Sequence, residues 1–148
     1  TELQESHTSF AALVFFRSPQ PQHSWMTAAA AVLDSAALAR SVLDIPPEPR
    51  ADLCIRSGYL ALRAIADFFG IPYYPNPHYP NQPVSLTRAE FEAALDRLAA
   101  DGIPLVADRQ QAWQNFAGWR VNYDSLLKPL AELTMSPTTP WIGEGAPD

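Results

Sequence analysis

The stretch DRQQAWQNFAGWRVNYDSLLKPLAEL, residues 108–133, decides the fold because its large apolar side chains recur at helical spacing. Asp108 is suited to cap the start of the segment. The apolar stripe comprises Trp113, Phe116, Trp119, Tyr123, Leu126, Leu127, Leu130 and Leu133. The pattern predicts one long helix on which the other helices pack. Trp119 should then lie in the core, where truncation to alanine would cost several kcal/mol.

The composition of the chain is typical of one helical domain. A chain of 148 residues with 47% apolar residues can bury an ordinary core. Alanine is abundant and β-branched residues are sparse, which favours helices over strands. The net charge of −6 disfavours nucleic-acid binding, because neutralising phosphates requires an excess of Lys and Arg. We therefore expect no nucleic-acid partner.

The segments outside the central stretch predict the rest of an all-α fold, a compact bundle of about four to five helices. Helices are expected at residues 1–17, 25–43, 51–69 and 87–100, and one long proline-rich loop at 73–86. For residues 1–17 a single strand is the alternative, but the sequence offers it no obvious partner strand. Residues 1–136 form a single helical domain in this interpretation, and residues 137–148 an extended or disordered tail.

Local signals mark several of the expected helix ends. Thr87 and Glu90 have the spacing of a capping box. Gly70, followed by Ile71 and Pro72, is a strong stop. Gly58 inside a helix predicts a close contact with a neighbouring helix, for which the alanine run 28–31 is a candidate.

Motifs for catalysis and metal binding are absent from the sequence. His7, His23 and His78 do not have the spacing of metal ligands. Cys54 lies in an apolar helical pattern, which predicts an inert core thiol. The glycine-rich loops of nucleotide-binding proteins and the GxSxG motif of hydrolases are also missing. We expect a protein that is not an enzyme and that uses no metal and no cofactor.

Asp34 is unusual because it falls midway along a mostly apolar segment. A buried carboxylate needs a partner, and Arg56, Arg63 or Arg120 could provide it. Structural pairing is favoured over acid–base catalysis, since no catalytic context surrounds the residue.

Two clusters combine an arginine with aromatic residues, one within residues 16–25 and one within residues 118–123. A guanidinium can stack on a ring and still bind a carboxylate or a phosphate. One interpretation is a contact for a ligand or a partner; the other, which we favour, is that these side chains tie helix ends together. The candidate binding residues are Arg17, His23, Trp25, Arg56, Trp119, Arg120 and Tyr123.

Four segments carry a resemblance to a known family: SHTSFAALVFFRSPQPQHSWMTAAAAVLDSAAL, RSGYLALRAIADFFGIPY, LTRAEFEAAL and GWRVNYDSLL. Together they resemble the soluble C-terminal region of bacterial ion-channel-type membrane proteins. Those proteins have a two-helix, potassium-channel-like pore module followed by a cytoplasmic helical region. The resemblance extends over nearly the whole chain, but the sequence contains no filter-like TVGYG.

The resemblance implies a non-enzymatic assembly or regulatory domain at the cytoplasmic face of the inner membrane. Residues 1–17 would link it to the pore, and the absence of methionine at Thr1 leads us to expect a fragment of a longer chain. The implied partners are the chain's own membrane-embedded region and further copies of itself. The alternative is a helical small-molecule-binding or sensor domain. It predicts an apolar pocket lined by Trp113, Trp119, Tyr123 and the helix at 53–69.

Overall fold

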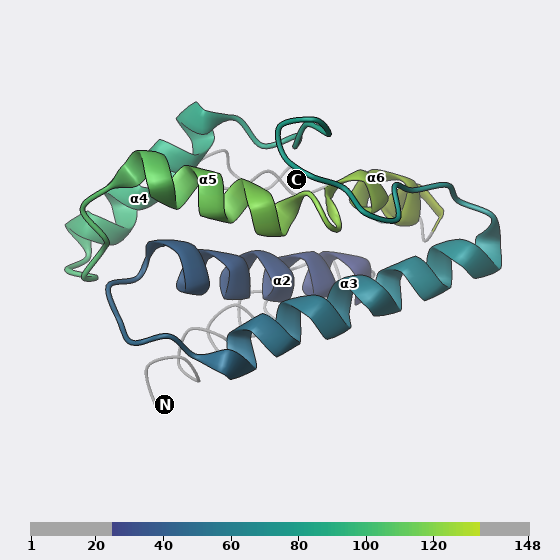
Figure 1. Cartoon of the computed structure of the whole chain (residues 1–148), viewed down its shortest axis with the longest axis horizontal. Helices are drawn as coiled ribbons and strands as arrows, with labels where there is room; N and C mark the ends of the chain where they lie inside the picture. Colours follow the sequence, from purple (N-terminus) through teal and green to yellow (C-terminus); the bar gives the residue numbers. More distant parts are fainter. Residues whose placement is uncertain (1–24, 134–148) are drawn as a thin grey trace, which may run out of the picture.

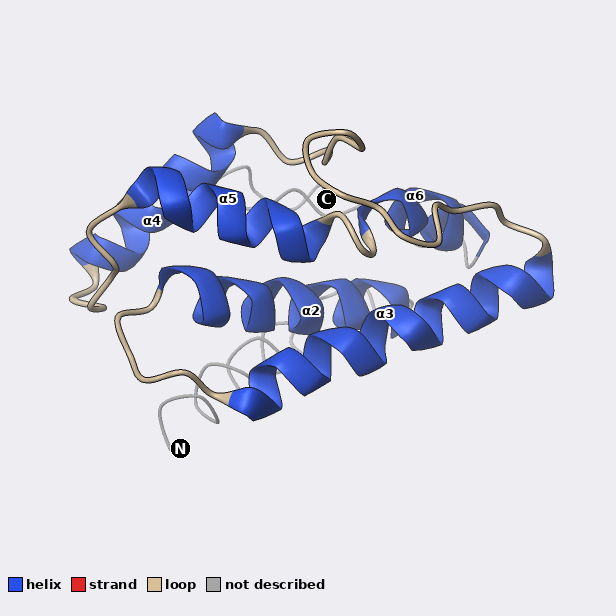
Figure 2. Cartoon of the chain, viewed as in Figure 1, coloured by secondary structure: helices blue, strands red, loops and turns tan. Residues whose placement is uncertain are grey.

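The computed structural model describes residues 25–133, and within that range the chain folds into helices without a β-strand. The predicted all-α bundle with one long proline-rich loop is confirmed (Figures 1 and 2). The predicted helix at 1–17 and the tail at 137–148 lie outside the described residues. The helices are α2 (Trp25–Val42), α3 (Pro49–Phe69), α4 (Arg88–Ala100), α5 (Arg109–Arg120) and α6 (Asp124–Leu133).

Three helix ends form as their sequence signals predict. The Thr87 side chain accepts a hydrogen bond from the Glu90 amide at 3.1 Å, and the Glu90 carboxylate accepts one from the Thr87 amide at 3.1 Å. Asp108 caps α5 by accepting from the Gln111 amide at 3.0 Å. Gly70 ends α3 with a φ of 70°, a left-handed conformation that glycine adopts without strain.

Helix α2 lies in the middle of the bundle. It packs against α3 on one side and against α5 and α6 on the other, while α4 packs on α5 (Figure 1). The segment that follows α2 also pairs with the segment that precedes α5. The Asp44 amide donates to the Pro104 carbonyl at 3.0 Å, and the Val106 amide donates to the Val42 carbonyl at 2.9 Å. The central position of α2 explains why its sequence is apolar on most sides.

A cluster of aromatic rings fills the space between α4 and α5. Phe91 lies 5.3 Å from Trp113 and 5.4 Å from Phe116, measured between ring centroids. The Trp113 indole N–H donates to the Tyr79 hydroxyl at 3.2 Å, and the two rings meet edge to face. Tyr79 belongs to the proline-rich loop, so this loop is anchored to the core rather than detached from it.

The predicted single helix over residues 108–133 is wrong, because the chain breaks between α5 and α6. The Asn122 side-chain amide donates to the carbonyls of Gly118 and Trp119 at 3.1 and 3.2 Å. The Tyr123 amide donates to the Arg120 carbonyl at 3.1 Å, in a tight turn. An asparagine that bonds the last carbonyls of a helix competes with the helical ladder, and α5 therefore ends at Arg120.

Two further expectations about α3 need correction. Cys54 is exposed on the surface and does not lie in the core. Gly58 does permit a close helix contact, but its neighbour is Leu33 of α2 and not the alanine run at 28–31. None of the helices within residues 25–133 has both the length and the apolar character needed to cross a membrane.

We predict opposite effects for alanine at two helical glycines. In Gly58→Ala the new Cβ collides with the buried Leu33 side chain. The overpacking, about 1–3 kcal/mol, outweighs the gain of about 1 kcal/mol in helix propensity. We expect a net loss of about 1 kcal/mol in the free energy of unfolding. In Gly118→Ala the Cβ enters open space, and the protein should gain up to about 1 kcal/mol. Urea unfolding followed by circular dichroism measures both; stabilisation by Gly58→Ala would contradict the close contact.

Candidate functional site

A buried polar network joins α2 to the junction between α5 and α6. Its centre is Asp34, which is 8% exposed. One oxygen of the Asp34 carboxylate accepts from Arg120 Nη1 at 2.7 Å, and the other accepts from the Tyr123 hydroxyl at 2.7 Å. Of the three arginines that could have paired with Asp34, Arg120 is therefore the partner. The two contacts satisfy both carboxylate oxygens in a place that water does not reach.

The network continues from Arg120 into the proline-rich loop. Arg120 Nε donates to Asp124 Oδ1 at 2.7 Å, one turn further along the chain. Asp124 also accepts from the Ser85 amide at 2.9 Å and from the Ser85 hydroxyl at 3.0 Å. A single guanidinium thus binds two carboxylates, which hold α2 on one side and the loop on the other.

The surroundings of the network shift the pKa values of two of its members. Burial raises the pKa of the Tyr123 hydroxyl well above its usual range, and the nearby Asp34 carboxylate raises it further. For Arg120, burial opposes the charged form, but Asp34 and the other acidic groups outweigh burial and raise its pKa. The tyrosine is therefore neutral and the arginine charged at neutral pH.

A second arginine, Arg63 of α3, ties the loop and the α5–α6 turn to the bundle. Its Nη2 donates to the Asn122 carbonyl at 3.1 Å, and its Nη1 donates to the Pro75 carbonyl at 3.3 Å. The guanidinium lies 4.5 Å from the centroid of the Tyr59 ring and 5.7 Å from that of Tyr73. These cation–π contacts and backbone bonds engage two rings and two nitrogens of the guanidinium.

The structure brings only part of the predicted site together. Arg120 and Tyr123 meet in the buried network, and Trp119 is half-buried at the edge of the core. Trp25, 48% exposed, begins α2, and Arg56 is exposed on α3. The remaining candidates, Arg17 and His23, lie outside the described residues.

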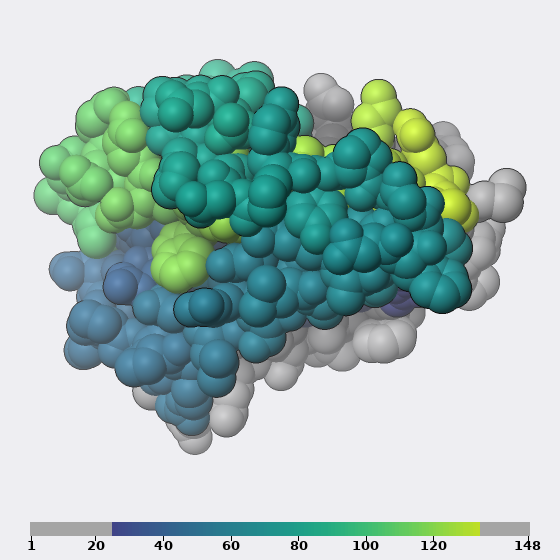
Figure 3. Space-filling model, turned by 45° about the vertical axis from the view of Figure 1, so that its right-hand side comes forward, coloured from purple at the N-terminus to yellow at the C-terminus, as the bar shows by residue number. Residues whose placement is uncertain are grey.

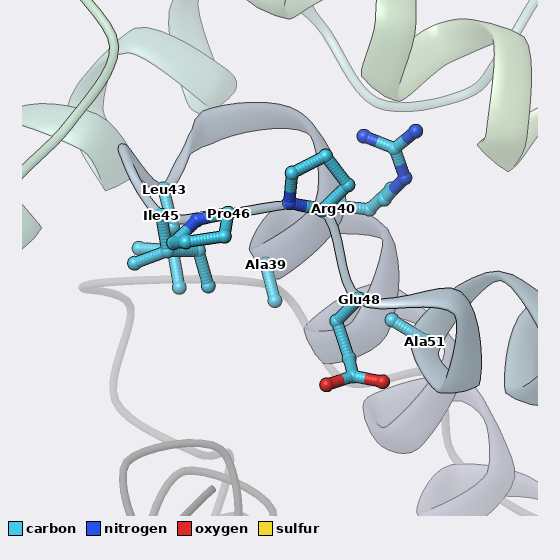
Figure 4. A pocket seen from close by; sticks show the side chains of 8 residues that line it. Ala39, Arg40, Leu43, Ile45, Pro46, Glu48 and Ala51 are labelled. Atoms are coloured by element: carbon cyan, nitrogen blue, oxygen red, sulfur yellow. The ribbon is translucent and has the colours of Figure 1, made fainter.

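A small pocket lies at the connection between α2 and α3 (Figure 4). Its volume of about 20 Å³ leaves room for about one water molecule, whereas ligand pockets have roughly 300–1,000 Å³. The Arg40 guanidinium and the Glu48 carboxylate point away from each other in Figure 4 and do not converge on a common point. Hydrogen bonds from Arg50 lower the pKa of Glu48 to about 2.

Two of the residues expected to line a larger apolar pocket, Trp113 and Tyr123, are buried in the core. Trp113 and Tyr123 are 6% and 0% exposed, and Trp113 is surrounded by the aromatic cluster described above. No group of His, Cys, Asp or Glu side chains within residues 25–133 is arranged to hold a metal ion.

No known family, curated protein or solved structure matches the chain. The site must therefore be interpreted from its own geometry. Its charged groups face one another across elements that are distant in the sequence, and the contacts described above join these elements to one another. Such an arrangement fixes α2, the α5–α6 junction and the loop relative to one another.

Breaking the Asp34–Arg120 pair should be far more costly than breaking an exposed pair. Asp34→Asn leaves a buried guanidinium with one carboxylate instead of two, and we expect a loss of about 3–5 kcal/mol in the free energy of unfolding. The matched control is Asp52→Asn, which breaks the half-exposed Arg40–Asp52 pair, and here we expect a loss below about 1 kcal/mol. Chemical unfolding of both variants tests this prediction. Equal losses in the free energy of unfolding would mean that the buried pair stabilises the fold no more than the half-exposed pair.

Ionisation of Tyr123 should destabilise the fold at alkaline pH. Its raised pKa means that the unfolded chain releases the proton near pH 10, before the folded protein does. Its contribution to stability is therefore complete below about pH 10 and is lost as the pH rises through the raised pKa. The free energy of unfolding, measured at about pH 8 and about pH 11, should fall less in Tyr123→Phe than in the wild type. Tyr74→Phe is the control, because Tyr74 is 61% exposed, and it should behave like the wild type.

Proposed function

We propose that this chain is a non-enzymatic, cytoplasmic assembly or regulatory domain of an ion-channel-like membrane protein. The proposal rests on our interpretation of the sequence, in which four segments resemble the C-terminal region of bacterial two-helix, potassium-channel-like proteins. These segments extend from the N-terminal part of the chain to α6 and are not confined to one helix.

The positions of the structural ties support this proposal. Asp34 lies in the first resembling segment, Arg63 in the second, and Arg120, Asn122 and Tyr123 in the last. The same residues form the two arginine-centred clusters that hold the helices together. These segments therefore contain side chains that determine how the bundle packs.

The path of the chain suggests how such a domain would act. In the full protein, the residues before Trp25 would lead toward the pore, and α2 begins at Trp25. Because α2 contacts α3, α5 and α6, a displacement at its start is transmitted to the rest of the bundle. The buried network resists local deformation, so the bundle would move as a unit when the pore changes conformation.

The coding sequence upstream of Thr1 provides the decisive test. We expect the reading frame to encode two hydrophobic spans of about 20 residues each with a filter-like loop between them. The complete protein, reconstituted in liposomes, should conduct potassium. Asp34→Asn should change the potassium flux, and Asp52→Asn should leave it unchanged. A reading frame without hydrophobic spans, or a complete protein without ion flux, would overturn the proposal.

A further inference from the structure

Helix α3 has an exposed apolar face. Leu53 is 62%, Leu60 48% and Phe68 82% exposed. Together with positions 57 and 64 they follow one another at intervals of three or four residues, which places them along one side of a helix. The positions between the large side chains are small and also exposed: Ser57, Ala61 and Ala64. We call this set the α3 stripe.

The α3 stripe lies opposite the side of α3 that faces the core. The core side consists of Ile55, Leu62 and Ala66, all of them buried. A surface helix ordinarily carries polar residues opposite its buried side, whereas a helix that is apolar on both sides is typical of one covered on both sides. In the space-filling view, α3 and the loop that follows it lie at the surface (Figure 3).

The α3 stripe of one copy can pack on the α3 stripe of a second copy. When two copies of α3 lie antiparallel about a twofold axis between positions 60 and 61, position 53 meets 68, position 57 meets 64, and position 60 meets 61. Leu53 then packs on the partner's Phe68, while Ser57 and the partner's Ala64 permit a close approach. Leu60 packs over the partner's Ala61, whose side chain is small. An isologous interface requires this kind of symmetry.

The charges at the border of the stripe match the same arrangement. Arg56 and Asp67 lie on the same edge of the stripe, and in an antiparallel pair identical edges face each other. Arg56 is then within about 3 Å, along the helix axis, of the level of the partner's Asp67. Arg56 makes none of the ion pairs formed within residues 25–133. Its guanidinium is thus available for an ion pair at each end of the interface.

We propose that the α3 stripe is an interface between two copies of this chain, with the two α3 helices antiparallel. The stripe is about 22 Å long and about 10 Å wide, so its area is below the roughly 800 Å² per partner of a standard interface. The dimer is therefore weak and forms in the micromolar range of concentration. This inference stands without the proposed channel function, because it rests on the surface of α3 alone.

Sedimentation equilibrium of the full 148-residue chain tests the proposal. Between about 10 µM and about 1 mM, the wild type should shift from monomer to dimer. Leu60→Glu places a carboxylate at the centre of the interface and should raise the dissociation constant by at least about tenfold. Leu133→Glu is the matched control, because Leu133 is similarly exposed, at 44%, but belongs to α6. Both variants should keep the wild-type circular dichroism spectrum and melting temperature.

Disulfide formation tests the antiparallel register independently. In a Cys54→Ser background, Ala61→Cys places a thiol beside the twofold axis, where it should form a disulfide with the same residue of the partner under mild oxidation. Ala99→Cys in the same background is the control, since Ala99 is exposed on α4, and it should remain monomeric.

Two results would overturn the proposal. The first is a wild type that stays monomeric up to about 1 mM. In that case, a lower melting temperature of Leu60→Glu would indicate that another segment of the same chain covers the stripe, for which residues 8–16 are the apolar candidate. The second is a Leu60→Glu variant that dimerises like the wild type, which would place the interface elsewhere.

Discussion

A carboxylate in the middle of an apolar helix sets the main constraint on this fold. Asp34 cannot be removed from water without partners, and its two oxygens are satisfied by Arg120 and Tyr123. Arg120 in turn holds Asp124, which binds the loop through Ser85. The need to hydrogen-bond the buried Asp34 carboxylate therefore fixes where α2, the α5–α6 junction and the loop lie. An apolar residue at position 34 would allow these elements to slide past each other, whereas a charge with directed bonds defines one arrangement.

Local signals in the sequence were sufficient to locate most of the helices, because capping is a short-range interaction. The Thr87–Glu90 box and the stop at Gly70 depend only on residues within one turn. The partner of Asp34 was not predictable in this way. Arg120 lies 86 residues away, and three arginines fulfilled the same requirement. The apolar stripe continues across Asn122 at helical spacing, so the spacing of apolar residues does not reveal the break there. This spacing carries no information about which backbone carbonyls a side chain bonds.

The candidate site and the surface of the protein have separate roles. Arg120 and Tyr123 face inward and hold the bundle together, while Arg56 lies on the surface beside the α3 stripe. The sequence placed all three in one set of binding candidates, because arginine and aromatic residues are used both for internal ties and for contacts between proteins. Only the burial of each residue distinguishes the two uses. Cys54 illustrates the same point: it lies between Leu53 of the exposed α3 stripe and the buried Ile55, so apolar neighbours in the sequence do not show whether a residue is buried.

The distance along the chain between Asp34 and Arg120 also determines when the protein becomes complete during synthesis. A ribosome delivers α2 early, whereas Arg120 and Tyr123, which bond the Asp34 carboxylate in the folded protein, emerge only when residues 120–123 have left the exit tunnel. A chain that ends before that point lacks both of these bonds. The ion pair therefore makes the native packing of the central helix conditional on synthesis through residue 123, and we expect a chain that ends earlier to be more susceptible to chaperone binding and proteolysis.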